Sequence, residues 1–484
     1  MSEKKLSSSF EVNKRRLDEL FGVGVNFDVA GREMHFAGKN AKLYFVDSFM
    51  NTAVLERLLI FFAELKRSGV PDDIDANRFA AEFVPFGETS ITDDVDNIAY
   101  SVLSGTVCLI FESLGANAII MDLRTYPARA IKEPDNDKVL RGARDGFVEA
   151  VKHNICMIRR RIRDVNFVAE KITVGENSRT DVAMCYISGV ADKDYVERLR
   201  NKLNSLKVGS LPLGHQSLAE ALVPSKWYNP FPKFRYTERP DAAAASILEG
   251  SVIVLCDTSP EAMILPTGIF DFLQEASDYY LPPLTGSYLR ILRHFVFILT
   301  LVLTPLWYLL VMNSDMIPSW LDFVKIKHDY TIPIILQLFA IEFALDGLKL
   351  ASLNTPDALS NSLSVVGGLI LGDFAVQVGW FIPEVIVYMA IVAISNFTQP
   401  SFELGFAFKF MRMLLLALTA LFNVWGFVLG LVLIIFFIAT NNTVDGSRSY
   451  LYPLIPFNKT AMKRLLVRVS AKSVDFNRFD SRRK

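Results

Sequence analysis

Residues 413–439 read MLLLALTALFNVWGFVLGLVLIIFFIA, a run without a single charged side chain. The run is longer than the roughly 20 apolar residues that an α-helix needs to cross the hydrocarbon core of a membrane. It therefore predicts that this part of the chain lies in a membrane. The wider apolar segment, 410–439, can form one long tilted helix, or two shorter helices joined by a tight turn near residues 423–426.

Four further apolar segments precede this run, at 291–312, 332–353, 359–381 and 384–397, and the last of them is short for a full crossing. The tail after residue 440 contains ten Lys or Arg and only three acidic residues. Because basic flanks tend to stay in the cytoplasm, this tail predicts an even number of crossings. A hairpin in the last segment, or one re-entrant earlier segment, would give an even number.

The remainder of the chain is typical of a soluble protein. Residues 1–285 carry dense charges and short apolar runs, and residues 1–16 lack the apolar core of a signal peptide. We therefore expect this half in the cytoplasm, followed by a membrane domain of four to six segments over 286–440 and a basic cytoplasmic tail over 441–484. The average composition hides this division, because 51% of the 484 residues are hydrophobic and the net charge is −1. That charge gives no indication of nucleic-acid binding.

The soluble half contains a sequence duplication. Residues 101–110 (SVLSGTVCLI) recur as 246–255 (SILEGSVIVL), and each reads as a helix end, a glycine and a buried strand. Upstream, VLERL at 54–58 matches YVERL at 195–199. Chance similarity is the alternative, since strand–helix joints resemble one another. We predict two similar α/β subdomains over 1–125 and 164–285.

A Pro-, Gly- and Arg-rich loop and a connecting helix are expected between the subdomains, over 126–163. The charged residues of this region can contact a neighbouring chain or lipid headgroups, or can form a solvated face with salt bridges inside the chain. The candidate interface residues are Arg129, Glu133, Arg141, Arg144, Glu149 and Arg160.

Motifs for catalysis are weak throughout the chain. The five histidines do not have metal-ligand spacings, and neither a P-loop nor a GxSxG motif occurs. The four cysteines lie far apart and are expected to be buried thiols of a reducing compartment. We therefore predict no catalytic residue, no metal site and no cofactor.

The membrane half carries ionisable residues in apolar segments. Glu342, Asp346 and Lys349 recur at i, i+4 and i+7, so they share one helix face, and Asp373 lies in the next segment. Ionisable groups at membrane depth normally face a protein interior or an aqueous path. These four residues are candidates for a cation path or its gate. The alternatives are a salt bridge of Lys349 with either acid that fastens helices, or helix ends that lie nearer the surface.

Two small-residue motifs predict close helix packing in the same half. The first GxxxG pair is Gly368 and Gly372, and the second is Gly426 and Gly430. Glycines four residues apart on one helix allow another helix to approach closely, within the chain or between chains.

Long motifs in both halves resemble the GerA family of spore germination proteins, specifically its A subunits. The matching stretches are YPAR at 126–129, EP at 133–134, RGARDGFVE at 141–149, SVVGG at 364–368, AISNF at 393–397 and PSFELG at 400–405. Within the family, LGDFAV at 371–376, PEVIVY at 383–388 and YPLIPFN at 452–458 are similar to the stage V sporulation protein AF (SpoVAF) type.

The resemblance implies a multi-pass protein of the spore inner membrane with a cytoplasmic two-part domain. It implies a homo-oligomer, a ring of about five subunits, that releases monovalent cations during germination. Partners would be B and C subunits of a germinant receptor, or a small membrane protein for the AF type. It carries over no catalytic residue. A non-conducting scaffold or signal-relay subunit is the alternative.

Overall fold

The structure, a computed structural model, describes residues 4–65, 70–71, 74–85, 87–125, 142–223, 228–354, 368, 370–441, 443–444 and 450–468. The chain divides into two compact units. The N-terminal unit contains Met1–Pro224 and Phe234–Pro266, and the helical unit contains Ser225–Lys233 and Thr267–Val474. This division falls earlier than the boundary expected at residue 285. The reason is that Ile269, Phe272 and Leu273 pack into the core of the helical unit.

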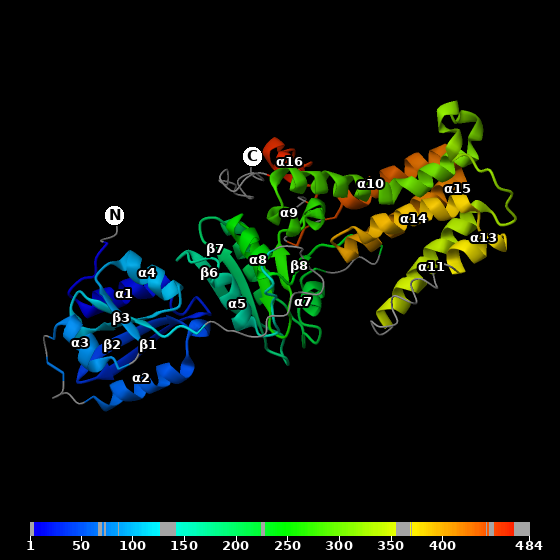
Figure 1. The fold of residues 1–484 in the computed structure, drawn as a ribbon. Helices are drawn as coiled ribbons and strands as arrows, with labels where there is room; N and C mark the ends of the chain where they lie inside the picture. Colours follow the sequence, from blue (N-terminus) through cyan, green and yellow to red (C-terminus); the bar gives the residue numbers. More distant parts are fainter. Residues whose placement is uncertain are drawn as a thin grey trace. The chain divides into compact units, whose positions relative to one another are not determined.

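The first half of the N-terminal unit is a fully antiparallel five-stranded sheet (Figure 1). Its order is β1 (Val29–Phe36), β2 (Lys39–Val46), β4 (Val107–Phe111), β5 (Ala118–Asp122) and β3 (Glu88–Thr92). Successive side chains of a strand point to opposite faces. Leu43 and Phe45 therefore pack beneath α2 (Thr52–Glu64) and α3 (Ala76–Phe83), whereas Tyr44 and Val46 pack beneath α1 (Phe10–Phe21) and α4 (Val95–Leu103).

The second half repeats this architecture. Its antiparallel sheet has the order β6 (Phe167–Val174), β7 (Thr180–Ile187), β9 (Val252–Cys256), β10 (Ala262–Leu265) and β8 (Arg235–Thr237). Helices α5 (Val151–Arg159) and α8 (Pro240–Leu248) cover one face. On the same sheet, α6 (Lys193–Asn204) contacts β6, and α7 (His215–Leu222) contacts β9.

The predicted pair of similar α/β subdomains is confirmed. The two sheets have the same strand order, and Gly105 and Gly250 follow equivalent helices with φ of 101° and 96°. A buried asparagine also recurs at the start of α1 and of α5. Asn13 bridges both main-chain groups of Ser7, at 2.8 and 2.7 Å, and Asn154 bridges those of Val148, at 2.8 and 2.5 Å. Local hydrogen bonds of one kind therefore fix the same helix start in each copy.

A buried ion pair joins the two repeats. Arg159, at the end of α5, donates to both carboxylate oxygens of Asp28, at 2.7 and 3.0 Å, and both side chains are almost fully buried. The Phe27 amide donates to the Ala169 carbonyl at 2.8 Å. The repeats therefore share a specific interface within one unit.

The helical unit is a bundle of apolar helices that lie alongside one another (Figure 1). Its helices are α9 (Ser277–Tyr280), α10 (Pro283–Met312), α11 (Ile334–Asn354), a π-helical segment (Ile370–Phe374), α13 (Ala375–Gln377), α14 (Pro383–Phe397), α15 (Phe402–Ala439) and α16 (Lys459–Leu466). In the described part of the chain, α10 and α15 are long and apolar enough to cross a membrane. The expected segment at 359–381 lies partly outside the described residues.

Helix α15 folds back on itself at Asn423. This residue has φ of 53° and ψ of −131°, so the helix is interrupted there. A Cβ on Gly426 would strike the Leu418 carbonyl, and one on Gly430 would lie 3.5 Å from Leu415 Cα. On a straight helix, the backbones of Leu415 and Gly430, fifteen residues apart in sequence, would be separated by about 22 Å. Arms 402–422 and 424–439 are therefore antiparallel neighbours, and Gly426 and Gly430 lie at their closest approach.

Candidate ion site between helices α11 and α15

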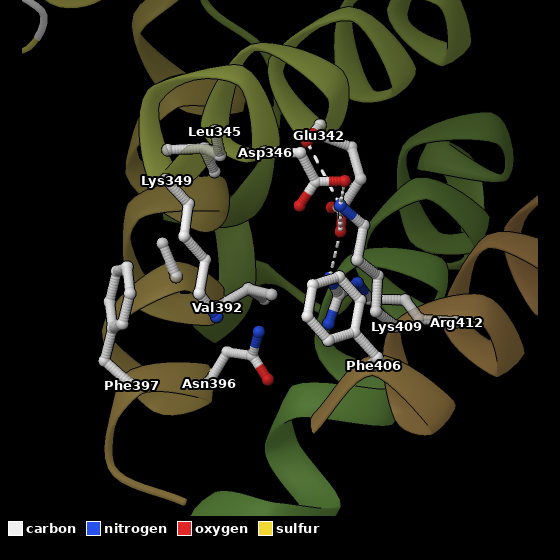
Figure 2. Close-up of a pocket in the computed structure, with 11 residues that line it drawn as sticks. Glu342, Leu345, Asp346, Lys349, Val392, Asn396, Phe397, Phe406, Lys409 and Arg412 are labelled. Atoms are coloured by element: carbon white, nitrogen blue, oxygen red, sulfur yellow. Dashed lines mark hydrogen bonds and ion pairs between the residues drawn. The ribbon is translucent and has the colours of Figure 1, made fainter. Parts of the chain in front are cut away.

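Two acidic residues of α11 face two basic residues of α15. Glu342 and Asp346 are one helical turn apart, as are Lys409 and Arg412, so each pair occupies one face of its helix. The facing pairs are drawn in Figure 2. We call these four residues, with Lys349, the charged cluster. Its members come from parts of the chain about 60 residues apart and meet only in the folded helical unit.

Direct ion pairs link the two helices. Arg412 donates to the Glu342 carboxylate, and Lys409 pairs with Asp346. The Lys409 ammonium also lies 3.5 Å from the Glu342 carboxylate and donates to the Glu342 carbonyl at 3.3 Å. The Lys409 and Arg412 side chains are only 4% and 3% exposed. Both carboxylates are thus engaged by buried cations.

A third helix takes part through Thr300 of α10. Arg412 donates to the Thr300 carbonyl at 2.8 Å, so its guanidinium spans α10, α11 and α15. A buried charge is tolerated only when it is paired and its remaining hydrogen-bonding groups find partners. The Thr300 carbonyl supplies such a partner and fixes the guanidinium relative to three helices.

Lys349 lies among three aromatic rings. Its ammonium is 3.7 Å from the ring centre of Phe402, 5.0 Å from that of Phe406 and 5.7 Å from that of Phe397. A cation over an aromatic face is attracted by the ring's negative surface. Lys349 therefore occupies the aromatic edge of the cluster.

A small pocket opens between these groups (Figure 2). The charged cluster lines it together with Leu345, Val392, Ala393, Asn396, Phe397 and Phe406. The cavity volume that the centre of a water molecule can occupy is about 30 Å³. One water needs roughly 10–15 Å³ of such volume. The pocket is therefore large enough for one or two waters.

The charge balance of the cluster works against a bound cation in this conformation. Two carboxylates face three positive groups, and the Glu342 and Asp346 carboxylates are paired with Lys409 and Arg412. A cation that entered would be repelled by three positive side chains and would have to displace at least one of them. The arrangement can therefore act as a closed gate or as a fastener between helices.

The structure brings three of the four candidate path residues together. Glu342, Asp346 and Lys349 line the pocket, whereas Asp373 lies in the π-helical segment, is exposed, and does not line the pocket. Gly368 and Gly372 have open space where a Cβ would lie. Their packing partner remains a prediction.

The candidate interface residues are only partly described. Arg129, Glu133 and Arg141 lie outside the described residues. Arg144, Glu149 and Arg160 are exposed on the N-terminal unit. Their role at a subunit interface stays a prediction.

Sequence reasoning missed Lys409 and Arg412 as members of the site. Their sequence signal is two cations three residues apart at the entrance to an apolar segment. Such residues normally reach the membrane surface, so they read as flanking charges. Only the position of α11 shows that they turn inward.

Comparison with known proteins identifies the family. The model of the family described as Bacillus/Clostridium GerA spore germination protein matches residues 15–478. The chain belongs to the GerA family. Stage V sporulation protein AF of Bacillus subtilis (strain 168) is 38% identical over 95% of this chain and 92% of its own length. Spore germination protein KA of the same organism is 29% identical over 80% of this chain and 71% of its own length.

A solved structure is similar to the N-terminal half of this GerA family member. It is the N-terminal domain of the A subunit of the Bacillus megaterium spore germinant receptor GerK3, with 21% identity and a TM-score of 0.42. The match covers 55% of this chain and 98% of that one.

Proposed function

We propose that this protein is a membrane subunit of a spore germination complex, and that it oligomerises into a channel that releases monovalent cations during germination. Membership of the GerA family and the similarity to stage V sporulation protein AF support the role in germination. The observation that carries the channel is the charged cluster, because ionisable residues between apolar helices commonly mark ion pathways.

The proposed channel is closed in this conformation. Lys409 and Arg412 neutralise the two carboxylates that would attract a cation. Opening requires these positive side chains to withdraw, which exposes Glu342 and Asp346 to the path. Asp373, on a different segment, is proposed to face the same path in the oligomer.

The topology belongs to the proposal. In the spore inner membrane, the N-terminal unit and the basic tail would both lie in the cytoplasm, with α15 contributing two crossings. Arg144, Glu149 and Arg160 would contact neighbouring subunits. Further germination proteins, either B and C subunits or a small membrane partner, would complete the complex, as the resemblance to the GerA family implies.

Potassium efflux from liposomes that contain the purified full-length chain tests the conduction path. The triple variant Glu342→Gln, Asp346→Asn and Asp373→Asn should abolish any efflux that the unmodified chain supports. Unchanged efflux through the triple variant would show that these three residues do not line the conduction path. The proposal that the protein forms a channel would still stand.

The alternative function is a non-conducting scaffold or signal-relay subunit. The ion pairs of the cluster favour it, because they fasten α11 to α15. Mass photometry in detergent gives the first discrimination. We expect a particle that contains about five copies of the 54.4 kDa chain, and a monomer would contradict the ring.

A further inference from the structure

The segment after α15 presents apolar side chains beside basic ones. Leu454, Ile455 and Phe457 are exposed in a turn-rich stretch, and α16 follows directly. In α16, Ala461 and Leu465 are buried, whereas Lys459 and Lys463 are exposed. We call residues 450–468 the tail collar. It combines an exposed apolar loop with an amphipathic basic helix.

The tail collar is held firmly at its start. Tyr450 is buried in the same core as Phe297 of α10 and Phe408 of α15, and its hydroxyl donates to the Pro232 carbonyl at 2.8 Å. The Ile269 amide donates to the Tyr450 carbonyl at 2.9 Å. The exposed apolar loop is therefore presented from a fixed base.

Helix α10 holds the other end of the collar. Arg290 donates to the Arg464 carbonyl at 2.9 Å, and the Arg468 amide donates to the Ser287 hydroxyl at 3.0 Å. Both contacts fall in the first three turns of α10. The collar is thus hydrogen-bonded to the beginning of an apolar helix that is long enough to cross a membrane.

A membrane crossing by α10 would leave its first turns at a membrane surface. The helix has 30 residues, which gives about 45 Å at 1.5 Å per residue, whereas the hydrocarbon core is about 30 Å thick. We assign the excess to the N-terminal end, because the charged residues of α10, Arg290 and Arg293, lie there and pair with the buried Asp278. With this placement of α10, the collar would lie at the depth of the lipid headgroups.

We propose that the tail collar binds anionic phospholipid headgroups, with the Leu454–Ile455–Phe457 loop inserted among the lipids. Exposed apolar side chains next to lysines are what an interfacial membrane element requires. The lysines complement the negative surface of a phospholipid bilayer. The collar would fix the depth and tilt of α10 at the membrane surface. This binding requires only that α10 crosses a membrane, so it does not depend on ion conduction.

Fluorescence quenching in reconstituted full-length protein tests the insertion. The Phe457→Cys variant is labelled with the environment-sensitive dye NBD and placed in vesicles that contain doxyl-labelled lipids. Leu213→Cys is the matched control, because Leu213 has the same 67% exposure and lies on the N-terminal unit. Burial raises the pKa of the native Cys156 and Cys256 thiols to about 12, so these residues label slowly at neutral pH.

We expect strong quenching at position 457 and little at position 213. Equal, weak quenching at both positions, or crosslinks from position 457 to a second copy of the chain, would overturn the proposal. The second result would show that a protein surface, and not lipid, covers the loop.

The preference for anionic headgroups is measured by the same signal. Quenching at position 457 should be greater in phosphatidylcholine vesicles that also contain phosphatidylglycerol than in phosphatidylcholine alone. Lys459→Gln with Lys463→Gln should remove this difference, whereas Lys193→Gln with Lys207→Gln, which removes the same charge from the N-terminal unit, should preserve it. A difference that survives the first pair of substitutions would overturn the headgroup assignment.

Discussion

At the residue scale, the cluster shows how buried charges can be kept in an apolar bundle. Glu342 and Arg412 are both nearly inaccessible, and each is the direct partner of the other. Removal of one partner leaves an uncompensated buried charge, which costs about 3–5 kcal/mol in proteins. The energetic importance of such a pair therefore lies mainly in the cost of breaking it.

We predict that Glu342→Gln lowers the free energy of unfolding of the detergent-solubilised chain by about 3–5 kcal/mol. Arg412→Gln should lower it by less, because the Lys409 ammonium still lies 3.5 Å from the Glu342 carboxylate. The double variant should lose clearly less than the sum, because the second substitution removes the unpaired charge that the first one leaves. Thermal unfolding followed by circular dichroism measures all three.

The exposed pair of Lys325 and Asp322 provides the control for this cycle. The Lys325 and Asp322 side chains are 39% and 59% exposed, so Lys325→Gln should change the stability by less than about 1 kcal/mol. Additive losses at Glu342 and Arg412 would show that the two residues act independently, against the contact described.

At the element scale, the hairpin in α15 is the feature that changes the count of crossings. Asn423 carries the turn, and it exchanges two amide hydrogen bonds with Asn313, at 2.7 and 3.1 Å. Asn313 follows α10 directly. The turn of α15 and the end of α10 therefore belong to the same end of the bundle.

We predict that the two ends of α15 lie on one side of the membrane. Cysteines placed at Phe402 and Thr440 should react with an impermeant thiol reagent from the same side, and cysteines at Ser314 and Trp425 from the opposite side. Labelling of positions 402 and 440 from opposite sides would show a continuous helix and contradict the hairpin.

The α/β duplication can be predicted from the sequence, because each repeated motif lies within one short stretch of the chain. The helix end, the glycine and the strand at 101–110 recur within one short window at 246–255. From sequence the hairpin is one of two alternatives, because the residue with the positive φ is Asn423 rather than a glycine, and its partner Asn313 is 110 residues away. The sequence predicts only the acidic half of the charged cluster. Glu342 and Asp346 are close together in sequence, whereas the cations of α15 meet them only through packing.

At the scale of the whole molecule, one chain contains two units that are stabilised by different interactions. The N-terminal unit is stabilised by two duplicated antiparallel sheets and by the Asp28–Arg159 pair between them. The helical unit is stabilised by apolar packing and by a few buried charges. The average composition of the chain describes neither unit. A germination role follows from the family, and conduction follows from the proposal about the cluster.

Potassium flux through Lys409→Gln in liposomes tests that proposal most directly. The Lys409→Gln substitution removes the ion-pair partner of Asp346 and one of the two cations that pair with the carboxylates of the cluster. Basal potassium efflux should therefore rise above that of the unmodified chain. Further substitution with Asp346→Asn should abolish the added efflux, and Lys325→Gln should behave as the unmodified chain does. If the Lys409→Gln protein folds and oligomerises but its efflux is no greater than that of the unmodified chain, the result would contradict a gate at this cluster.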